Sequence, residues 1–184
     1  MADTFLTRAF SSAGNRQKFT ISVRVKQAFT DAGGNFVLFS AGSASNTYGQ
    51  VRIKSNDYWQ YEDEQGGSVK ASRYTDTAER DPTAWSHLVL RMDTTQATDS
   101  NRLRFYKNGQ LMGTGGGNYP DQNESLVINN NVTHAIGTLW RGSDSGGHWD
   151  GYMSQFIFCD GQSYDPTSFG SANSDGVWTP ITIS

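Results

Sequence analysis

The chain has 184 residues, of which 15 are Lys or Arg and 18 are Asp or Glu, giving a formal net charge of −3. This length suits a single domain with a packed core. The basic residues are scattered rather than clustered, which is not the pattern of a surface that binds nucleic acid by counterion release. No run approaches the ~18 apolar residues of a membrane span. Composition therefore predicts no nucleic-acid partner and no membrane insertion.

Cys159 is the one cysteine in the sequence, so an intrachain disulfide is excluded. It lies within an apolar segment, which predicts a buried and unreactive thiol. The first eight residues lack a basic region followed by an apolar stretch, so we expect no signal peptide. Synthesis in a reducing cytoplasm is the corresponding expectation.

Short segments with alternating or continuous apolar residues recur every ten to fifteen positions, separated by Gly, Asn, Asp and Ser. We predict strands at 19–25, 35–39, 50–54, 58–61, 103–107, 125–129 and 134–140. Asn56-Asp57 and Asn108-Gly109 are predicted turns, and the latter is typical of a type I′ hairpin. The sequence lacks a convincing 3.6-residue period, and one short helical turn at 166–169 is expected, with Asp165 as its N-cap. The whole chain, residues 1–184, is thus predicted to be one all-β, two-sheet antiparallel jelly-roll sandwich.

The closing third begins a further strand at Asp150-Gly151, and Asp160-Gly161 ends it. A strict two-residue period places alternate side chains on opposite faces. The first face would carry Tyr152, Ser154, Phe156 and Phe158. The second face would carry Met153, Gln155, Ile157 and Cys159.

Several motifs occur in a characteristic order along the chain. These are Trp85-Ser-His87 before Asp93, Asn108-Gly109, Ala135-Ile-Gly137, His148-Trp-Asp-Gly151, Asp165-Pro, Phe169-Gly170 and Gly176-Val-Trp178-Thr-Pro180. The order resembles concanavalin A-like lectin/glucanase domains of the laminin-G type, in the variant found in tailed-bacteriophage structural proteins. This resemblance implies a concanavalin A-like sandwich on a virion, with capsid or tail proteins as partners and a homo-oligomer, trimers being favoured.

Glucanases of this superfamily need two or three carboxylates alternating on one strand. The nearest cluster here is Glu62-Asp63-Glu64, which adjoins Gln65-Gly66-Gly67 and is predicted to be a solvated hairpin tip. We therefore expect no catalytic residues and no enzyme activity, with a glycoside hydrolase as a distant alternative.

Metal binding has little support from spacing. His87, His134 and His148 show no HxH or HExxH pattern. Calcium at a rim of the sandwich is the cofactor left open, because loops dense in Asp and Asn can supply its oxygen ligands. The candidate ligands are Asp144, Asp150, Asp121 and Asn123.

Sugar recognition needs aromatic rings beside hydrogen-bonding side chains. The segment 140–150 is the best candidate, and we expect its glycines to give it an open shape. Its candidate ligand contacts are Trp140, Arg141, Asp144, His148 and Trp149, with Tyr119 as a neighbour. A second aromatic group is Tyr58, Trp59 and Tyr61, whereas Trp85 and Trp178 are predicted to fill the core. The competing interpretation is that Trp149 caps the core beneath the loop.

The sequence supports two function classes. The first is a non-enzymatic virion accessory protein, namely a capsid decoration, head-fibre or tail-associated module. The second is a stand-alone lectin or receptor-binding module that recognises cell-surface carbohydrate. The two overlap, because a decorating protein can also bind glycans.

Overall fold

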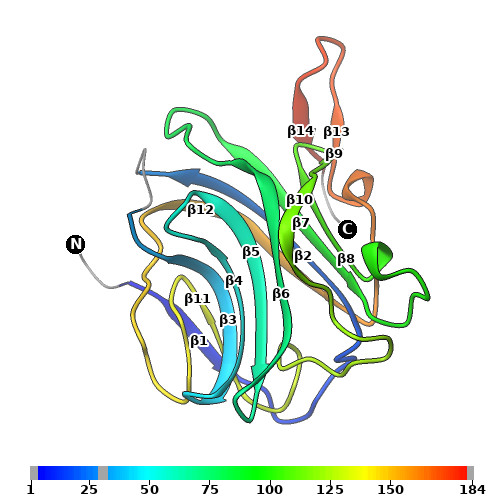
Figure 1. The fold of residues 1–184 in the computed structure, drawn as a ribbon. Helices are drawn as coiled ribbons and strands as arrows, with labels where there is room; N and C mark the ends of the chain where they lie inside the picture. The colour runs from blue at the N-terminus through cyan, green and yellow to red at the C-terminus, as the bar shows by residue number, and fades with distance from the viewer. Residues whose placement is uncertain (1–3, 29–32, 182–184) are drawn as a thin grey trace.

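The computed structural model describes residues 4–28 and 33–181. Two antiparallel sheets pack face to face, and a small hairpin stands beside them (Figure 1). The seven-stranded sheet has the order β1 (Leu6–Ala9), β11 (Thr133–Ile136), β3 (Phe36–Ala44), β4 (Thr47–Ile53), β5 (Tyr58–Gln65), β6 (Ser68–Ala78), β10 (Thr114–Asn118). The five-stranded sheet has the order β12 (Gly151–Asp160), β2 (Lys18–Gln27), β7 (Ser86–Asp93), β8 (Leu103–Lys107), β9 (Gln110–Leu111). The predicted two-sheet sandwich is confirmed.

The core lies between the sheets and results from alternation along the strands. Phe19, Ile21 and Val23 of β2 face Trp59 and Tyr61 of β5, and all five side chains are at most 1% exposed. Burying such large apolar side chains is the main stabilising contribution in a sandwich. The second aromatic group of the sequence is therefore divided, because Trp59 and Tyr61 belong to the core.

Turn chemistry agrees with the sequence at Asn108-Gly109, which joins β8 to β9. Both residues have positive φ, 47° and 79°, as a type I′ turn requires. The predicted helical turn is a 3₁₀ turn, η2 (Pro166–Ser168), and a second one, η1, spans Asp99–Asn101. Asp165 occupies the N-cap position of η2, but its carboxylate accepts a hydrogen bond from Arg91 instead of capping the turn.

The strand predicted at 125–129 is wrong. Leu126, Val127 and Ile128 are completely buried but form no ladder. Their backbone is satisfied individually: the amide of Val127 donates to the Asp63 carboxylate at 2.8 Å, and the amide of Asn129 donates to Nε2 of His134 at 2.9 Å. An apolar run thus enters the core as irregular backbone, because side chains replace the missing strand partners.

The strict alternation predicted for β12 is also wrong. Between Ser154 and Ile157 the pairing with β2 shifts, and Gln155 has a φ of 50°. This bulge inserts an extra residue and reverses the facing of the later strand residues. Met153 packs on the main core before the bulge, and Phe156 and Phe158 pack on it after the bulge.

A hairpin of β13 (Gly170–Ala172) and β14 (Trp178–Pro180) projects from the sandwich (Figure 1). Trp178 fixes its base: Nε1 donates to Nδ1 of His87 at 2.8 Å, and the ring lies over Gly109, where a Cβ atom would come within 2.2 Å of it. Trp85, in contrast, is 41% exposed, so its predicted place in the core is wrong. Neither 3₁₀ turn, nor anything else helical in the described ranges, could cross a membrane.

Candidate functional site

The Gly-rich segment 138–149 is a closed loop, which corrects the open shape expected from its glycines. Gly142, Gly146 and Gly147 have φ between 66° and 83° and make tight turns. The loop folds back on the start of β3: the amide of Val37 donates to the Gly147 carbonyl at 2.7 Å, and Trp140 donates to Ser40 Oγ at 2.9 Å. Its shape is therefore fixed before any ligand arrives.

Asp144 is the centre of this loop. Its carboxylate accepts hydrogen bonds from the Thr138 hydroxyl, the Gly146 amide at 3.1 Å and Nε2 of His148 at 3.0 Å. Burial works in the opposite direction, but the bonds from Thr138, Gly146 and His148 lower the pKa of Asp144. Asp144 thus orients His148, whose ring stacks on Phe5 with centroids 5.9 Å apart and an interplanar angle of 19°.

Trp149 is half-buried and stacks on the buried Trp59, with centroids 6.1 Å apart and an interplanar angle of 14°. Its amide donates to the Gly137 carbonyl at 2.9 Å, which fixes the backbone where the chain enters β12. Both sequence interpretations of Trp149 therefore have support. The ring packs on the core, and it also lines a pocket.

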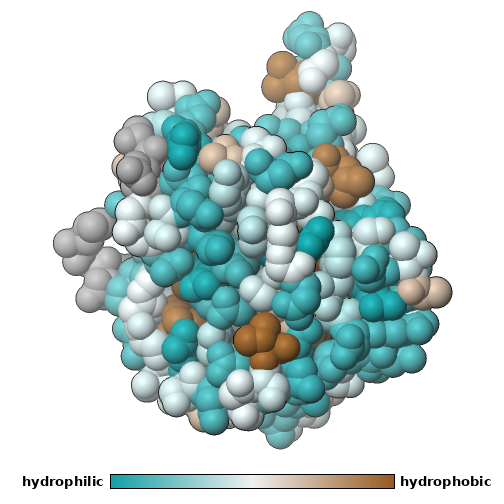
Figure 2. Space-filling view, viewed as in Figure 1, coloured by the Kyte–Doolittle hydropathy of each residue, from teal (hydrophilic) through white to brown (hydrophobic). Residues whose placement is uncertain are grey.

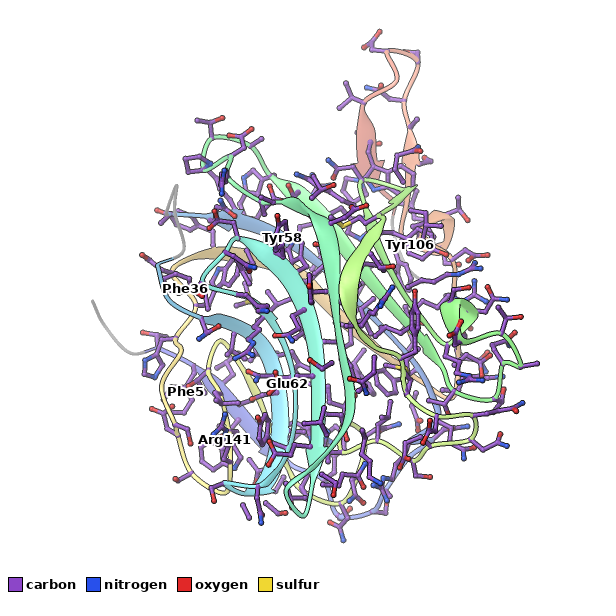
Figure 3. The ribbon with its side chains drawn as sticks, in the orientation of Figure 1. Phe5, Phe36, Tyr58, Glu62, Tyr106 and Arg141 are labelled. Carbon is purple, nitrogen blue, oxygen red and sulfur yellow. The ribbon has the colours of Figure 1, made fainter. Side chains whose placement is uncertain are left out.

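This pocket, which we call the end pocket, lies where β3 and β12 begin, and its volume is about 630 Å³. Phe5 and Phe36 lie together on this side of the molecule (Figure 3). Such a volume is in the range of small-ligand sites. The lining residues are Thr4, Phe5, Leu6, Phe36, Ile136, Gly137, Gly147, His148, Trp149, Asp150, Gly151 and Met153.

A second polar and aromatic surface covers the outer side of the seven-stranded sheet. We call it the polar face and define it by Tyr48, Gln50, Arg52, Gln60 and Glu62. Glu62 lies within β5 and not at a hairpin tip, which corrects the prediction for 62–64. Glu62 accepts hydrogen bonds from Tyr48 at 2.6 Å and from Arg52 at 2.8 Å, and Arg52 also donates to Gln60 at 2.9 Å. Figure 3 shows Glu62 near the middle of this face.

Most side chains of the polar face contact one another. Burial, and next the hydrogen bond to Glu62, raise the pKa of Tyr48 above its usual range. The guanidinium of Arg141 covers the Tyr48 ring at 4.0 Å. Leu139 packs on Val37 and Tyr48, so the closed loop covers one end of this face. Arg141 consequently belongs to the polar face and is not among the residues that line the end pocket.

Tyr119 does not join the loop. It lies directly after β10, at the opposite edge of the seven-stranded sheet from β11, where Arg73 covers its ring at 4.1 Å. Tyr58 is the outward member of the second aromatic group and stacks on Tyr74 at 6.0 Å. Trp140 lies beside the end pocket, and the centroids of its ring and the Phe5 ring are 6.5 Å apart. The structure thus brings Trp140, Asp144, His148 and Trp149 together and places Tyr119 elsewhere.

Among the predicted calcium ligands, only the side chain of Asp144 has an observed role in the described part of the chain, and the contacts of Asp150 and Asn123 concern their backbone. Asp144 closes its loop, Asp150 accepts the Ala28 amide through its backbone carbonyl, and Asn123 adopts a φ of 63° in a turn. Within the part of the chain that the structure describes, no three His, Cys, Asp or Glu side chains gather as metal ligands. Calcium binding at these positions stays a prediction.

Ser22 and His87 resemble a nucleophile–base pair but have the wrong tautomer. Nδ1 of His87 accepts from Trp178, so its ring proton is on Nε2 and is donated to Ser22 Oγ at 2.8 Å. Burial, and next the charge of Arg24, lower the pKa of His87 to about 4. His87 therefore cannot take the Ser22 proton in this arrangement, as a serine nucleophile would need.

Phe5 and Phe36 are pocket residues that the sequence did not indicate. Phe5 directly precedes the short strand β1, and Phe36 begins β3, so each looks like an ordinary strand residue in the sequence. Their meeting depends on the order of strands in the sheet, which places β11 between β1 and β3.

The family model described as "Concanavalin A-like lectin/glucanases superfamily", of the laminin-G type, matches residues 3–181. The chain belongs to this superfamily. The resemblance stated from the motifs is thereby confirmed for the family and the fold. No curated protein matches the chain significantly.

Solved structures agree with this fold. A pentraxin of Limulus polyphemus has 17% identity and a TM-score of 0.54, over 83% of this chain and 68% of the other. A CBM40 of a Ruminococcus gnavus sialidase, bound to α2,3-sialyllactose, has 14% identity and a TM-score of 0.54, over 84% and 90%. Laminin α1 domains LG4-5 of mouse have 12% identity and a TM-score of 0.61, over 88% and 43%. At these identities the likeness concerns the fold alone.

Proposed function

We propose that this domain is a non-catalytic carbohydrate-binding module that takes a short saccharide in the end pocket. The observation that carries the proposal is the composition of that pocket: aromatic rings of Phe5, Phe36 and Trp149 beside the polar side chains of His148 and Asp150. Aromatic faces bind the apolar CH face of a sugar, and polar groups at the rim bind its hydroxyls. The sugar-bound CBM40 among the similar structures supports this class of ligand.

Preorganisation favours binding at this place. Asp144 holds His148, Phe5 stacks on His148, and Trp59 supports Trp149, so the lining groups lose little freedom when a ligand enters. A shallow pocket of this kind supports modest affinity for one saccharide. Several copies in one assembly would raise the overall affinity for a surface that carries many such saccharides.

A binding role is also favoured over catalysis. The carboxylate of Glu62 is engaged by Arg52 and Tyr48 on the polar face, and His87 donates to Ser22 instead of accepting from it. The Ser22–His87 arrangement lacks the base that a serine nucleophile requires.

A glycan array tests the proposal. We expect the wild-type chain to bind a restricted set of glycans, and Phe5→Ala and His148→Ala to reduce that binding at least tenfold. Tyr164→Ala is the matched control, because Tyr164 is an exposed aromatic residue that packs on Phe169, away from the end pocket. Absence of any bound glycan, or unchanged binding in both pocket variants, would overturn the proposal.

The setting that we propose is the outside of a bacteriophage particle, with capsid or tail proteins as partners and a homo-oligomer, trimers being favoured. Its support is the order of the C-terminal motifs, which resembles phage structural proteins. Mass spectrometry of purified particles is expected to detect the chain, and light scattering is expected to give a mass above that of a monomer. Particles that lack the chain, or a monomer that binds no capsid or tail, would contradict this setting.

A further inference from the structure

A second space lies beside the end pocket, along the side of the sandwich. This space, which we call the apolar channel, has a volume of about 230 Å³ and lies between the edge strands β1 and β12. Leu6 and Ile136 line both the end pocket and the apolar channel. They are also cross-strand partners in the pairing of β1 with β11, so one pair of side chains forms the boundary.

The walls of the apolar channel are largely hydrocarbon, although Thr7 and Arg8 of β1 also line it. Phe156 and Phe158, which the β12 bulge turns inward, pack against Phe39 with centroids 5.2 and 5.8 Å apart. Phe10 lines the opposite side and stacks on His134 at 4.1 Å.

His134 adds no hydrogen-bonding group to the channel. Its Nε2 accepts from the Asn129 amide at 2.9 Å, and its Nδ1 donates to the Val132 carbonyl at 3.0 Å. With both nitrogens engaged, the ring presents only its face. The channel thus differs from the end pocket, which has His148 and Asp150 in its lining.

We infer that the site takes a glycolipid, that is, a saccharide whose reducing end carries a hydrocarbon chain, with the sugar in the end pocket and the first methylenes in the apolar channel. This inference rests on the proposed function, because it extends the same pocket. Because Leu6 and Ile136 line both spaces, a partly polar pocket and a largely apolar one adjoin, which matches the two halves of an amphiphile. A free saccharide would leave the channel empty.

Methyl and octyl β-glycosides of glucose, galactose and N-acetylglucosamine provide the test, with the octyl compounds kept below their micelle concentration. For a sugar that binds, we expect the octyl glycoside to bind at least about tenfold more tightly than the methyl glycoside, because a few buried methylenes suffice for that factor. Amide resonances of Arg8, Phe10 and Phe158 should shift with octyl glycosides alone, whereas those of Gly147 and His148 should shift with both.

Phe10→Glu should abolish the advantage of the octyl chain and retain methyl glycoside binding, because Phe10 lines the apolar channel and not the end pocket. Phe10 is half-buried and lies outside the core cluster, and Leu111→Glu at a 58% exposed position of the other sheet is the matched control. Equal affinities for methyl and octyl glycosides would overturn the inference and leave the proposed function intact. Shifts of the channel resonances with 1-octanol, without binding of any glycoside in the panel, would instead overturn both.

Discussion

The end pocket and the polar face both combine aromatic rings with hydrogen-bonding side chains, yet they differ in what those groups contact. On the polar face Tyr48, Arg52 and Glu62 bond mainly to one another, and Arg141 covers the Tyr48 ring. In the end pocket the rings of Phe5, Phe36 and Trp149 line a pocket of about 630 Å³. A surface rich in the right residue types is therefore a weaker candidate for a binding site when most of those residues already bond to each other. The hydrophilic front of the sheet in Figure 2 illustrates such a face.

The largest effect is expected at the floor of the end pocket. Trp149→Ala should lower the free energy of unfolding by about 3 kcal/mol, because it removes a ring that packs on Trp59 and the core. Trp85→Ala is the control and should cost less than about 1 kcal/mol, because Trp85 is 41% exposed. Denaturant unfolding measures both. Equal costs would show that the pocket floor is not part of the core.

Lowering the pH should have opposite effects on stability at two places in the fold. His134 lies beside the apolar channel, and Asp63 lies beneath the polar face. Burial lowers the pKa of His134 to about 4, so its stabilising contribution is present above pH 6.5 and is lost as the pH falls towards 4. Burial raises the pKa of Asp63 to about 6, against the hydrogen bonds from Val127, Gln65 and Tyr61. Its ionised form therefore destabilises the fold above pH 6, and this cost is relieved as the pH falls towards 3.8.

Each of these shifts corresponds to roughly 3 kcal/mol, and His87 acts with the same sign as His134. The wild type should therefore lose about 3 kcal/mol of unfolding free energy between pH 7 and pH 4. His134→Gln should flatten this fall, and Asp63→Asn should steepen it. Urea titrations at several pH values measure the slopes, and a fall that is unchanged in both variants would refute the assignment.

A smaller effect is expected on the polar face itself. Glu62→Gln weakens the ion pair with Arg52, where both side chains are 15% exposed, and should cost about 1–2 kcal/mol. Glycan binding should remain, and neither protein should release reducing sugars from polysaccharides. If the wild type releases reducing sugars and Glu62→Gln abolishes that release, the polar face is catalytic.

The sequence was informative where local chemistry decides structure. Asn108-Gly109 favours a type I′ turn, and the alternating apolar residues at 19–25 indicated a strand. The expected solvent face of that strand is wrong, because Thr20 and Ser22 are also buried. Prediction from the sequence failed where residues far away in the chain determine the local structure. The buried segment 126–128 depends on the carboxylate of Asp63, and the facing of Phe156 and Phe158 depends on a bulge at Gln155.

The candidate site shows the same division. His148 and Trp149 were found because they are neighbours in the chain, whereas Phe5 and Phe36 come from strands that only the sheet order brings together. Arg141, the neighbouring candidate in the sequence, lies apart from the end pocket because the closed loop turns it towards Tyr48. Neither the sheet order nor the closure of the loop has a local signal in the sequence.

The smallest effect is expected at Arg141, which the sequence proposed as a ligand contact. Its guanidinium lies over the Tyr48 ring, and among the described residues its buried Nε has no hydrogen-bond partner. Arg141→Ala should thus cost less than about 1 kcal/mol, the usual contribution of a cation–π contact near a surface. Glycan binding should be unchanged, since Arg141 does not line the end pocket, and Arg141→Lys should behave like the wild type. The buried Oε1 of Gln50 likewise has no hydrogen-bond partner in the described ranges, so a ligand on the polar face would find one donor and one acceptor there. If Arg141→Ala removes binding while its melting temperature stays within about 2 °C of the wild type, the polar face is part of the site.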